Sequence, residues 1–321
     1  MNIKAQYRKI SINEIDQDDR TYSLTPISDW RPHSPTGKAL VCQAITRPPL
    51  VLEKKAAEYL IVTSRQLIYD LSRKTADHLC DCLVIPAETK PEEILALALE
   101  DILATRLPSV AEQATCWHKA IDWFGEKKAK ELFGDRLTLA SKLQGRKLAT
   151  LAGLGDKNLE ALHQGALDMK VAFRLVDLEE KDRNALLEVI HLLNLSNSNQ
   201  RKLLDLCNEL HRRKNVSISE ILSDDEFNDI IDHPEANPPQ KTAMLMKRLR
   251  DCCFPRLRET ETEFRKFIGK LNPPKGVSIN HSPSFENDAI TLTVNYSNRE
   301  EFSESWPTMK KSLPNRKKQA E

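Results

Sequence analysis

The side chains best suited to chemistry are the cations and polar groups between residues 126 and 157. Lysines and arginines outnumber carboxylates there, and the periodicity predicts a helix on either side of Gly134. Cations on such helices hold phosphate oxygens, and hydroxyl and amide groups reach base edges if a helix enters a major groove. A solvated helical face is the alternative, and phosphate attraction demands less than base readout. The candidate DNA contacts are Lys127, Lys128, Lys130, Ser141, Lys142, Gln144, Arg146 and Lys147.

Cysteine and histidine spacing argues against metal binding and nucleophilic catalysis. Cys80 and Cys82 form a C-x-C pair, and Cys252 and Cys253 are adjacent, but no C-x₂-C pair suited to a tetrahedral zinc site occurs. The eight histidines form no H-E-x-x-H pattern, and no serine lies in a G-x-S-x-G elbow. We therefore expect buried structural thiols, no metal site and no catalytic residue.

The composition predicts a soluble, cytoplasmic protein. Charged residues make up 30% of the chain, and no apolar run approaches the about 20 residues that a membrane helix needs. An odd number of cysteines, seven, and the lack of an apolar signal segment fit a reducing compartment. The net charge of +1 creates no overall field for a polyanion. Nucleic-acid binding therefore requires a local basic patch.

The elements that must position these residues predict an α+β protein in three folded parts. Residues 1–90 combine strand-like and helical patterns, 91–223 are helical throughout, and 241–309 combine helices with a strand pair. The acidic, proline-containing residues 224–240 are predicted to be a linker, and the basic residues 310–321 a disordered tail.

The order of segments in the first 125 residues resembles the N-terminal half of the ParB family of chromosome- and plasmid-partition proteins. It runs strand, strand, polar turn, helix, strand, long helix, and a second helix that ends in Trp-Phe-Gly. These segments are expected at 48–52, 58–62, 63–66, 67–71, 82–86, from Pro91 onward and at 111–124, after a first strand at 8–12. The same sheet fold occurs in sulfiredoxin, but residues 60–70 contain no cysteine, which argues against that redox chemistry.

Two nucleotide motifs of that family correspond to altered residues here. The first is a Gly-Glu-Arg-Arg-type turn, where glycine lets backbone amides approach phosphates and arginines neutralise them. At this point the chain has Thr-Ser-Arg-Gln-Leu at 63–67, so Ser64 occupies the glycine position. The second, Glu-Asn-x-x-Arg, corresponds to Glu100 and Asp101 with a displaced Arg106. The resemblance implies that the chain binds CTP with Mg²⁺. The candidate nucleotide-binding residues are Ser64, Arg65, Gln66, Glu100, Asp101 and Arg106.

The helical middle of the chain extends the resemblance. Residues 107–113 are similar to the Leu-Asn-Pro-x-Glu-x-Ala entry of the family's DNA-binding domain. Residues 154–162 resemble the Leu-Pro-x-x-Val-x-x-Leu helix, and 165–172 the Gly-Lys-Leu-Ser-x-x-His-Ala segment, without its histidine. The implied fold is a small mixed-sheet ParB/sulfiredoxin-like N-terminal domain, an all-α helix-turn-helix-like middle domain and a small α+β C-terminal module.

The resemblance spans about residues 8–222 and implies a nucleoid-associated, bacterial-type DNA-binding protein of partition or transcription regulation. DNA, a second copy of the chain and a partition ATPase are the implied partners, and no membrane is expected. The alternating apolar strand at 289–296 suits dimerisation. Two alternatives stay open: a CTP-dependent switch or residual CTPase with a divergent site, and a protein-interaction module with neither activity.

Overall fold

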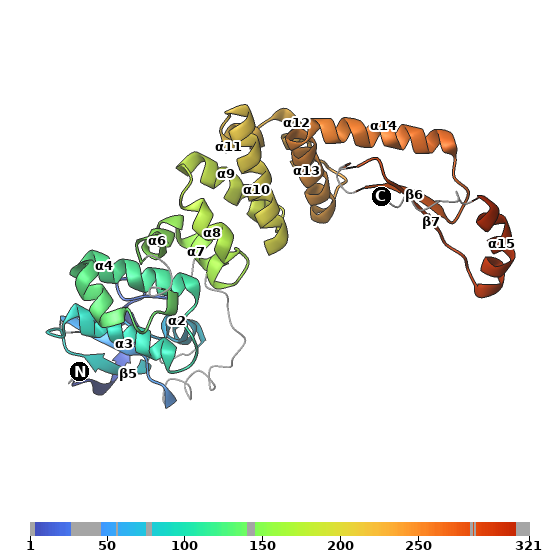
Figure 1. Cartoon of the computed structure of the whole chain (residues 1–321). Coiled ribbons are helices and arrows are strands. Elements are labelled where there is room, and N and C mark those ends of the chain that lie inside the picture. Colours follow the sequence, from blue (N-terminus) through green and yellow to red (C-terminus); the bar gives the residue numbers. More distant parts are fainter. Residues whose placement is uncertain are drawn as a thin grey trace. The chain divides into compact units, whose positions relative to one another are not determined.

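The computed structural model describes residues 4–26, 46–55, 57–74, 79–139, 145–282, 285 and 287–312. The chain is of mixed α+β class, as its sequence predicts. It divides into two compact units, residues 1–242 and 243–321 (Figure 1). Among the described helices, none is both long and apolar enough to cross a bilayer.

The first unit begins with a five-stranded sheet. Its strands, in chain order, are β1 (Gln6–Ser11), β2 (Ile15–Asp16), β3 (Leu50–Lys55), β4 (Glu58–Ile61) and β5 (Leu79–Ile85). They lie in the order β1-β5-β3-β4-β2. β3 is parallel to β5 and β2 is parallel to β4, while the remaining pairs are antiparallel. The predicted small mixed sheet and its four longer strands are thereby confirmed.

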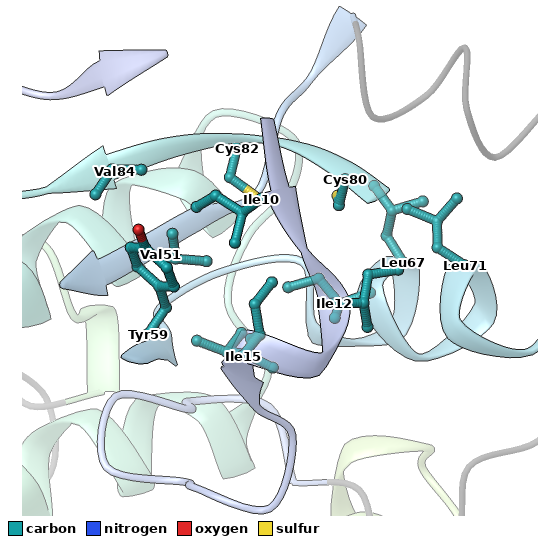
Figure 2. Packing of buried hydrophobic residues seen from close by; sticks show 12 residues of the cluster. Ile10, Ile12, Ile15, Val51, Tyr59, Leu67, Leu71, Cys80, Cys82 and Val84 are labelled. Carbon is teal, nitrogen blue, oxygen red and sulfur yellow. The ribbon is translucent and has the colours of Figure 1, made fainter. Parts of the chain in front are cut away.

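Helix α2 (Arg65–Lys74) packs with one face of this sheet. Successive strand residues alternate between faces, so Cys80, Cys82 and Val84 of β5 all point into the same core. Leu67 and Leu71 of α2 lie four residues apart, on one side of the helix, and join that core (Figure 2). The two cysteines are buried free thiols, as expected from their spacing.

Two long helices follow the sheet. α3 (Pro91–Leu103) begins at a proline, which is tolerated in the first helical turn. α4 (Val110–Phe133) begins with a capping box, in which the Ser109 side chain accepts from the amide of Glu112 and the Glu112 carboxylate accepts from the amide of Ser109. Gly125 has φ 78° and ψ 158°, so α4 consists of two helical segments, 110–124 and 126–133, with a break at the glycine. The sequence correctly placed a helix end there.

Further helices complete the first unit. Six of those that the structure describes have eight residues or fewer: α6 (Gly145–Thr150), the 3₁₀ turn η2 (Leu151–Leu154), α7 (Asp156–His163), α8 (Met169–Leu175), α11 (Ile218–Leu222) and α12 (Asp225–Ile231). Two others are as long as α3 or longer: α9 (Glu180–Leu192) and α10 (Asn197–Lys214).

The predicted linker at 224–240 is largely helical instead. Asp224 caps α12 by accepting from the amide of Glu226 at 3.1 Å, and Phe227 anchors this helix by being buried. Acidic residues also suit the positive N-terminal end of a helix. Pro238 begins α13 (Pro238–Cys253). The composition suggested a linker because capping residues and prolines at helix starts have the same amino-acid bias as loops.

The second unit contains most of α13, then α14 (Pro255–Leu271), β6 (Val277–His281), β7 (Ile290–Val294) and α15 (Arg299–Ser312). The predicted strand pair is an antiparallel β6–β7 hairpin, with Ile279 opposite Leu292. Of the expected tail, residues 310–312 end α15, and 313–321 lie outside the described residues.

Candidate functional site

A pocket of about 210 Å³ lies where β4 ends and α2 begins. Four of the residues assigned to nucleotide binding line it: Ser64, Arg65, Gln66 and Asp101. They come from the β4–α2 turn and from α3, which are separate in sequence. The rest of the lining is mainly from residues 23–25, 61–63 and the α3 face around Ala98.

The backbone at Ser64 has the conformation that glycine adopts most readily. Its φ is +57°, in the left-handed region that side chains disfavour. The Ser64 carbonyl accepts from the amide of Leu67 at 3.0 Å, which begins α2. Ser64 therefore occupies a turn whose backbone geometry glycine adopts readily.

Arg65 is the cation of this pocket, and its charge is directed at the protein backbone. Its guanidinium donates to the carbonyl oxygens of Gln17 and Asp19, and the side chain is nine-tenths buried. Burial, followed by the nearby charge of Arg20, lowers the pKa of Arg65. The buried Nε has no hydrogen-bond partner among the described residues. Arg65 thus holds the loop at 17–19 through both Nη atoms, while Nε is without a partner among the described residues.

Asp101 is paired with a cation that the sequence analysis did not identify. Arg47 Nη2 donates at 2.7 Å to both the backbone oxygen and the Oδ1 atom of Asp101. Arg47 precedes the Pro-Pro pair before β3, where no motif marks it. Only the folded chain brings positions 47 and 101 together.

Glu100 and Arg106, also assigned to nucleotide binding, do not line the pocket. Glu100 is exposed and forms an ion pair with Arg136 at 2.9 Å. Arg106 binds the Glu112 carboxylate through both Nη atoms, at 2.6 and 2.5 Å. Burial alone would raise the pKa of Glu112, but hydrogen bonds from Arg106 and Thr25 outweigh it and lower the pKa. Both residues lie outside the pocket lining, and each pairs with a charge on the helical segment.

Lys119 of α4 is a second functional candidate that sequence patterns missed. Its ammonium donates to the carbonyl oxygens of Arg20, Thr21 and Ser23, at 2.7, 2.6 and 3.1 Å. Burial lowers the pKa of Lys119 to about 8. Together with Arg65, this lysine fixes the loop at 17–25, which forms one wall of the pocket.

The second candidate site is built by α4 and the segment that follows it. The Trp117 ring nitrogen donates to the carbonyl oxygen of Gly145 at 2.8 Å, and Gln113 Oε1 accepts from the amide of Leu139 at 3.0 Å. A Cβ at position 145 would lie 2.9 Å from the Trp117 ring, so this close approach requires glycine. The first segment of α4 therefore holds α6, with the helix at 126–133 and a turn at 134–136 between them.

The described lysines between residues 127 and 147 differ in their partners. Lys128 pairs with Glu92 at 2.9 Å, and Lys147 pairs with Asp177 at 2.6 Å. Lys127 and Lys130 are exposed, share one helical face, and form no ion pair within the described ranges. Lys142 lies outside the described residues. The same is true of Ser141, Gln144 and the side chain of Arg146.

Comparison with known proteins adds no relative to this picture. No protein-family model matches the chain, and no curated protein matches it significantly. In the part of the chain that the structure describes, no three histidine, cysteine or acidic residues are grouped to hold a metal ion. The functional argument therefore depends on the two candidate sites themselves.

Proposed function

We propose that this chain is a ParB-like DNA-binding protein that acts in partition or transcription regulation at the nucleoid. The observation that carries the proposal is the contact of Trp117 with Gly145, which joins the first segment of α4 to α6, together with exposed Lys127 and Lys130 on the helix at 126–133. A short helix followed by a turn, as at 126–136, is typical of helix-turn-helix modules. The glycine-like turn at Ser64 adds support for the ParB resemblance from an unrelated part of the chain.

Phosphate contact is the favoured mode of DNA binding. Lys127 and Lys130 are free to meet a phosphate oxygen, and Lys128 can exchange its carboxylate for one. An exposed ion pair is worth at most about 1 kcal/mol, so replacing a carboxylate with a phosphate costs little. Phosphate contacts position a protein on DNA without reading sequence.

The test is a titration of fluorescein-labelled duplex DNA, followed by anisotropy at several salt concentrations. Changing Lys127 and Lys130 together to glutamate should weaken binding at least tenfold and reduce the salt slope by about 2. Lys181→Glu with Lys202→Glu is the charge-matched control, since both lysines are exposed on α9 and α10. Equal losses in both double variants would show only a net-charge effect and end the proposal.

A nucleotide phosphate in the β4–α2 pocket is the second candidate, with CTP and Mg²⁺ as the ligands. The gathering of Ser64, Arg65, Gln66 and Asp101 favours it. The volume of about 210 Å³ lies below the about 300–1,000 Å³ typical of small-molecule sites, so a nucleotide requires the loop at 17–25 to move. Calorimetry with CTP or ATP and Mg²⁺ tests this function, and absence of binding heat at millimolar ligand would exclude it. Phosphate release assays would then separate a switch from a CTPase.

We also propose that the second unit forms a homodimer interface. Helix α14 contains no buried residue, and Ile290 and Leu292 of β7 are more than half exposed. An isolated two-stranded hairpin is marginally stable, and both of its strands present free edges. Ile290→Lys with Leu292→Lys should convert a dimer into a monomer in sedimentation velocity. If the wild-type chain stayed monomeric when its concentration in this experiment was raised 50-fold, the proposed interface would be contradicted. A partition ATPase remains the proposed protein partner.

A further inference from the structure

A groove in the first unit lies between three helices that the proposed DNA function leaves unused. It has a volume of about 290 Å³. Ala185, Glu188, Val189 and Leu192 of α9 line one side, and their spacing of three and four residues places them on one helical face. The other lining residues come from α11 with its C-terminal cap and from α12: Ser219, Leu222, Ser223, Asn228, Ile231 and Asp232.

The inside of the groove is apolar and partly open. Val189 and Leu222 are buried, whereas Leu192 at the end of α9 is 57% exposed. Leu192 therefore presents apolar surface at the edge of the groove. Ridges of apolar residues between helices accept an amphipathic helix through side chains at i, i+3, i+4 and i+7.

The neutral polar residues that line the groove form hydrogen bonds within the chain. The backbone amide of Ser219 donates to Asp182 at 2.8 Å, the Ser223 hydroxyl donates to the Glu220 carbonyl at 3.2 Å, and the side-chain amide of Asn228 donates to the Ser223 carbonyl at 3.1 Å. The groove can therefore recognise a ligand mainly by its shape and charge, because few hydrogen-bond donors are left unused. This arrangement suits an apolar side-chain row better than a polar metabolite.

The charged side chains that line the groove are both acidic. Glu188 and Asp232 are exposed on opposite walls, and the lining contains no lysine or arginine. α12 adds Asp225 and Asp229 beside them. The neighbouring Lys241 is directed at the backbone, since its ammonium donates to the carbonyl oxygen of Ile231. A partner that approaches this surface gains from positive charge flanking its apolar row.

We propose that this groove binds a basic amphipathic helix of a partner protein. The helix places leucine-like side chains against Val189, Leu192 and Ile231. Its lysines or arginines lie between the carboxylates of Glu188 and Asp232. This inference is independent of DNA binding, because it uses none of the residues at 127–147.

The probe is a fluorescein-labelled 14-residue peptide of leucine and lysine in a helical amphipathic order. Two control peptides accompany it: the same composition in an order that scatters leucine around the helix, and the same order with glutamate in place of lysine. Anisotropy titrations against the full chain should show binding of the first peptide. The scrambled and acidic peptides should bind at least tenfold more weakly.

Variants locate the site. Leu192→Gln and Asp232→Lys should each weaken binding of the basic peptide at least fivefold. Leu107→Gln and Glu131→Lys are the matched controls, since Leu107 is 78% exposed and Glu131 is exposed on α4. Hydrogen exchange with the bound peptide should show protection in α9 and α12. Equal binding of the scrambled peptide, unchanged affinity of both groove variants, or protection elsewhere would overturn the proposal. Self-association that depends on Leu192 would overturn it in favour of a second copy.

Discussion

The cations of the β4–α2 pocket and those of the helical segment have different partners. Arg65 and Lys119 are largely buried and donate to backbone carbonyl oxygens of the loop at 17–25. Lys127, Lys128 and Lys130 are on the surface, where Lys128 pairs with the partly exposed carboxylate of Glu92 and lies over the ring of Phe124. Backbone carbonyls cannot be exchanged without moving the loop, whereas a surface carboxylate competes freely with phosphate. The comparison separates cations that hold the fold from cations available to a polyanion.

The largest effect should come from Glu112, which anchors Arg106 away from the pocket. Glu112 is fully buried and accepts from Arg106, Thr25 and the amide of Ser109. Glu112→Ala removes the acceptor of all three donors, and each hydrogen bond to a charged group is worth about 1.5–3 kcal/mol of unfolding free energy. Urea unfolding followed by circular dichroism measures this loss. Glu131→Ala, at an exposed position on the same helix, should change stability by less than about 0.5 kcal/mol. Similar small losses in both variants would show that Arg106 is free for another role.

The second largest effect is expected from a pair of variants that removes one cation from each group. Arg65→Met leaves the carbonyl oxygens of Gln17 and Asp19 without their donor. We expect a loss of about 1.5–3 kcal/mol of unfolding free energy, the value of hydrogen bonds to charged groups. Lys128→Met removes an exposed pair and should cost under about 1 kcal/mol. If the two losses proved equal, burial would not distinguish these cations, and Arg65 would be as available to a phosphate as Lys128.

The sequence could predict local features of these sites but not their long-range partners. Strand alternation and the Gly125 break depend on neighbouring residues, and both were expected. Glu112, the partner of Arg106, lies in the first turn of a predicted helix, yet it also accepts from Thr25, which is 87 residues away in sequence. Lys147 pairs with Asp177, 30 residues away. A count of charges along the chain cannot show which of them the fold has already paired.

The same limit applies to what covers an apolar face. The alternation in β5 and in β7 has the same period, but α2 covers Cys80 and Cys82, whereas Leu292 stays more than half exposed. Both patterns predict a strand with one apolar side. Only the packed structure distinguishes a core face from a face left for a partner.

Lys119 offers a pH-dependent version of the comparison. Its pKa in the folded chain is about 8, below the ordinary value of 10.5, because it is buried. Between these values the unfolded chain binds a proton that the folded chain has released, so the contribution of Lys119 to stability rises with pH. In urea unfolding between pH 7.5 and 10, the unfolding free energy of the wild type should therefore rise relative to that of Lys119→Met as the pH increases. A constant difference across this range would mean that the ammonium stays charged, like the surface lysines.

The smallest change in stability is expected from Ser64→Gly, in the turn between β4 and α2. Ser64 has a positive φ, which costs a side chain energy, while glycine at this point loses more backbone entropy on folding. Ser64→Gly should consequently stabilise the chain by no more than about 1 kcal/mol. Ser64→Val should destabilise it by more than that, because a β-branched residue rarely adopts this conformation. Thermal unfolding of both variants and the wild type measures these two changes in stability. If valine were tolerated as well as glycine, the turn would not require its left-handed backbone, and the geometric link between Ser64 and the family glycine would be lost.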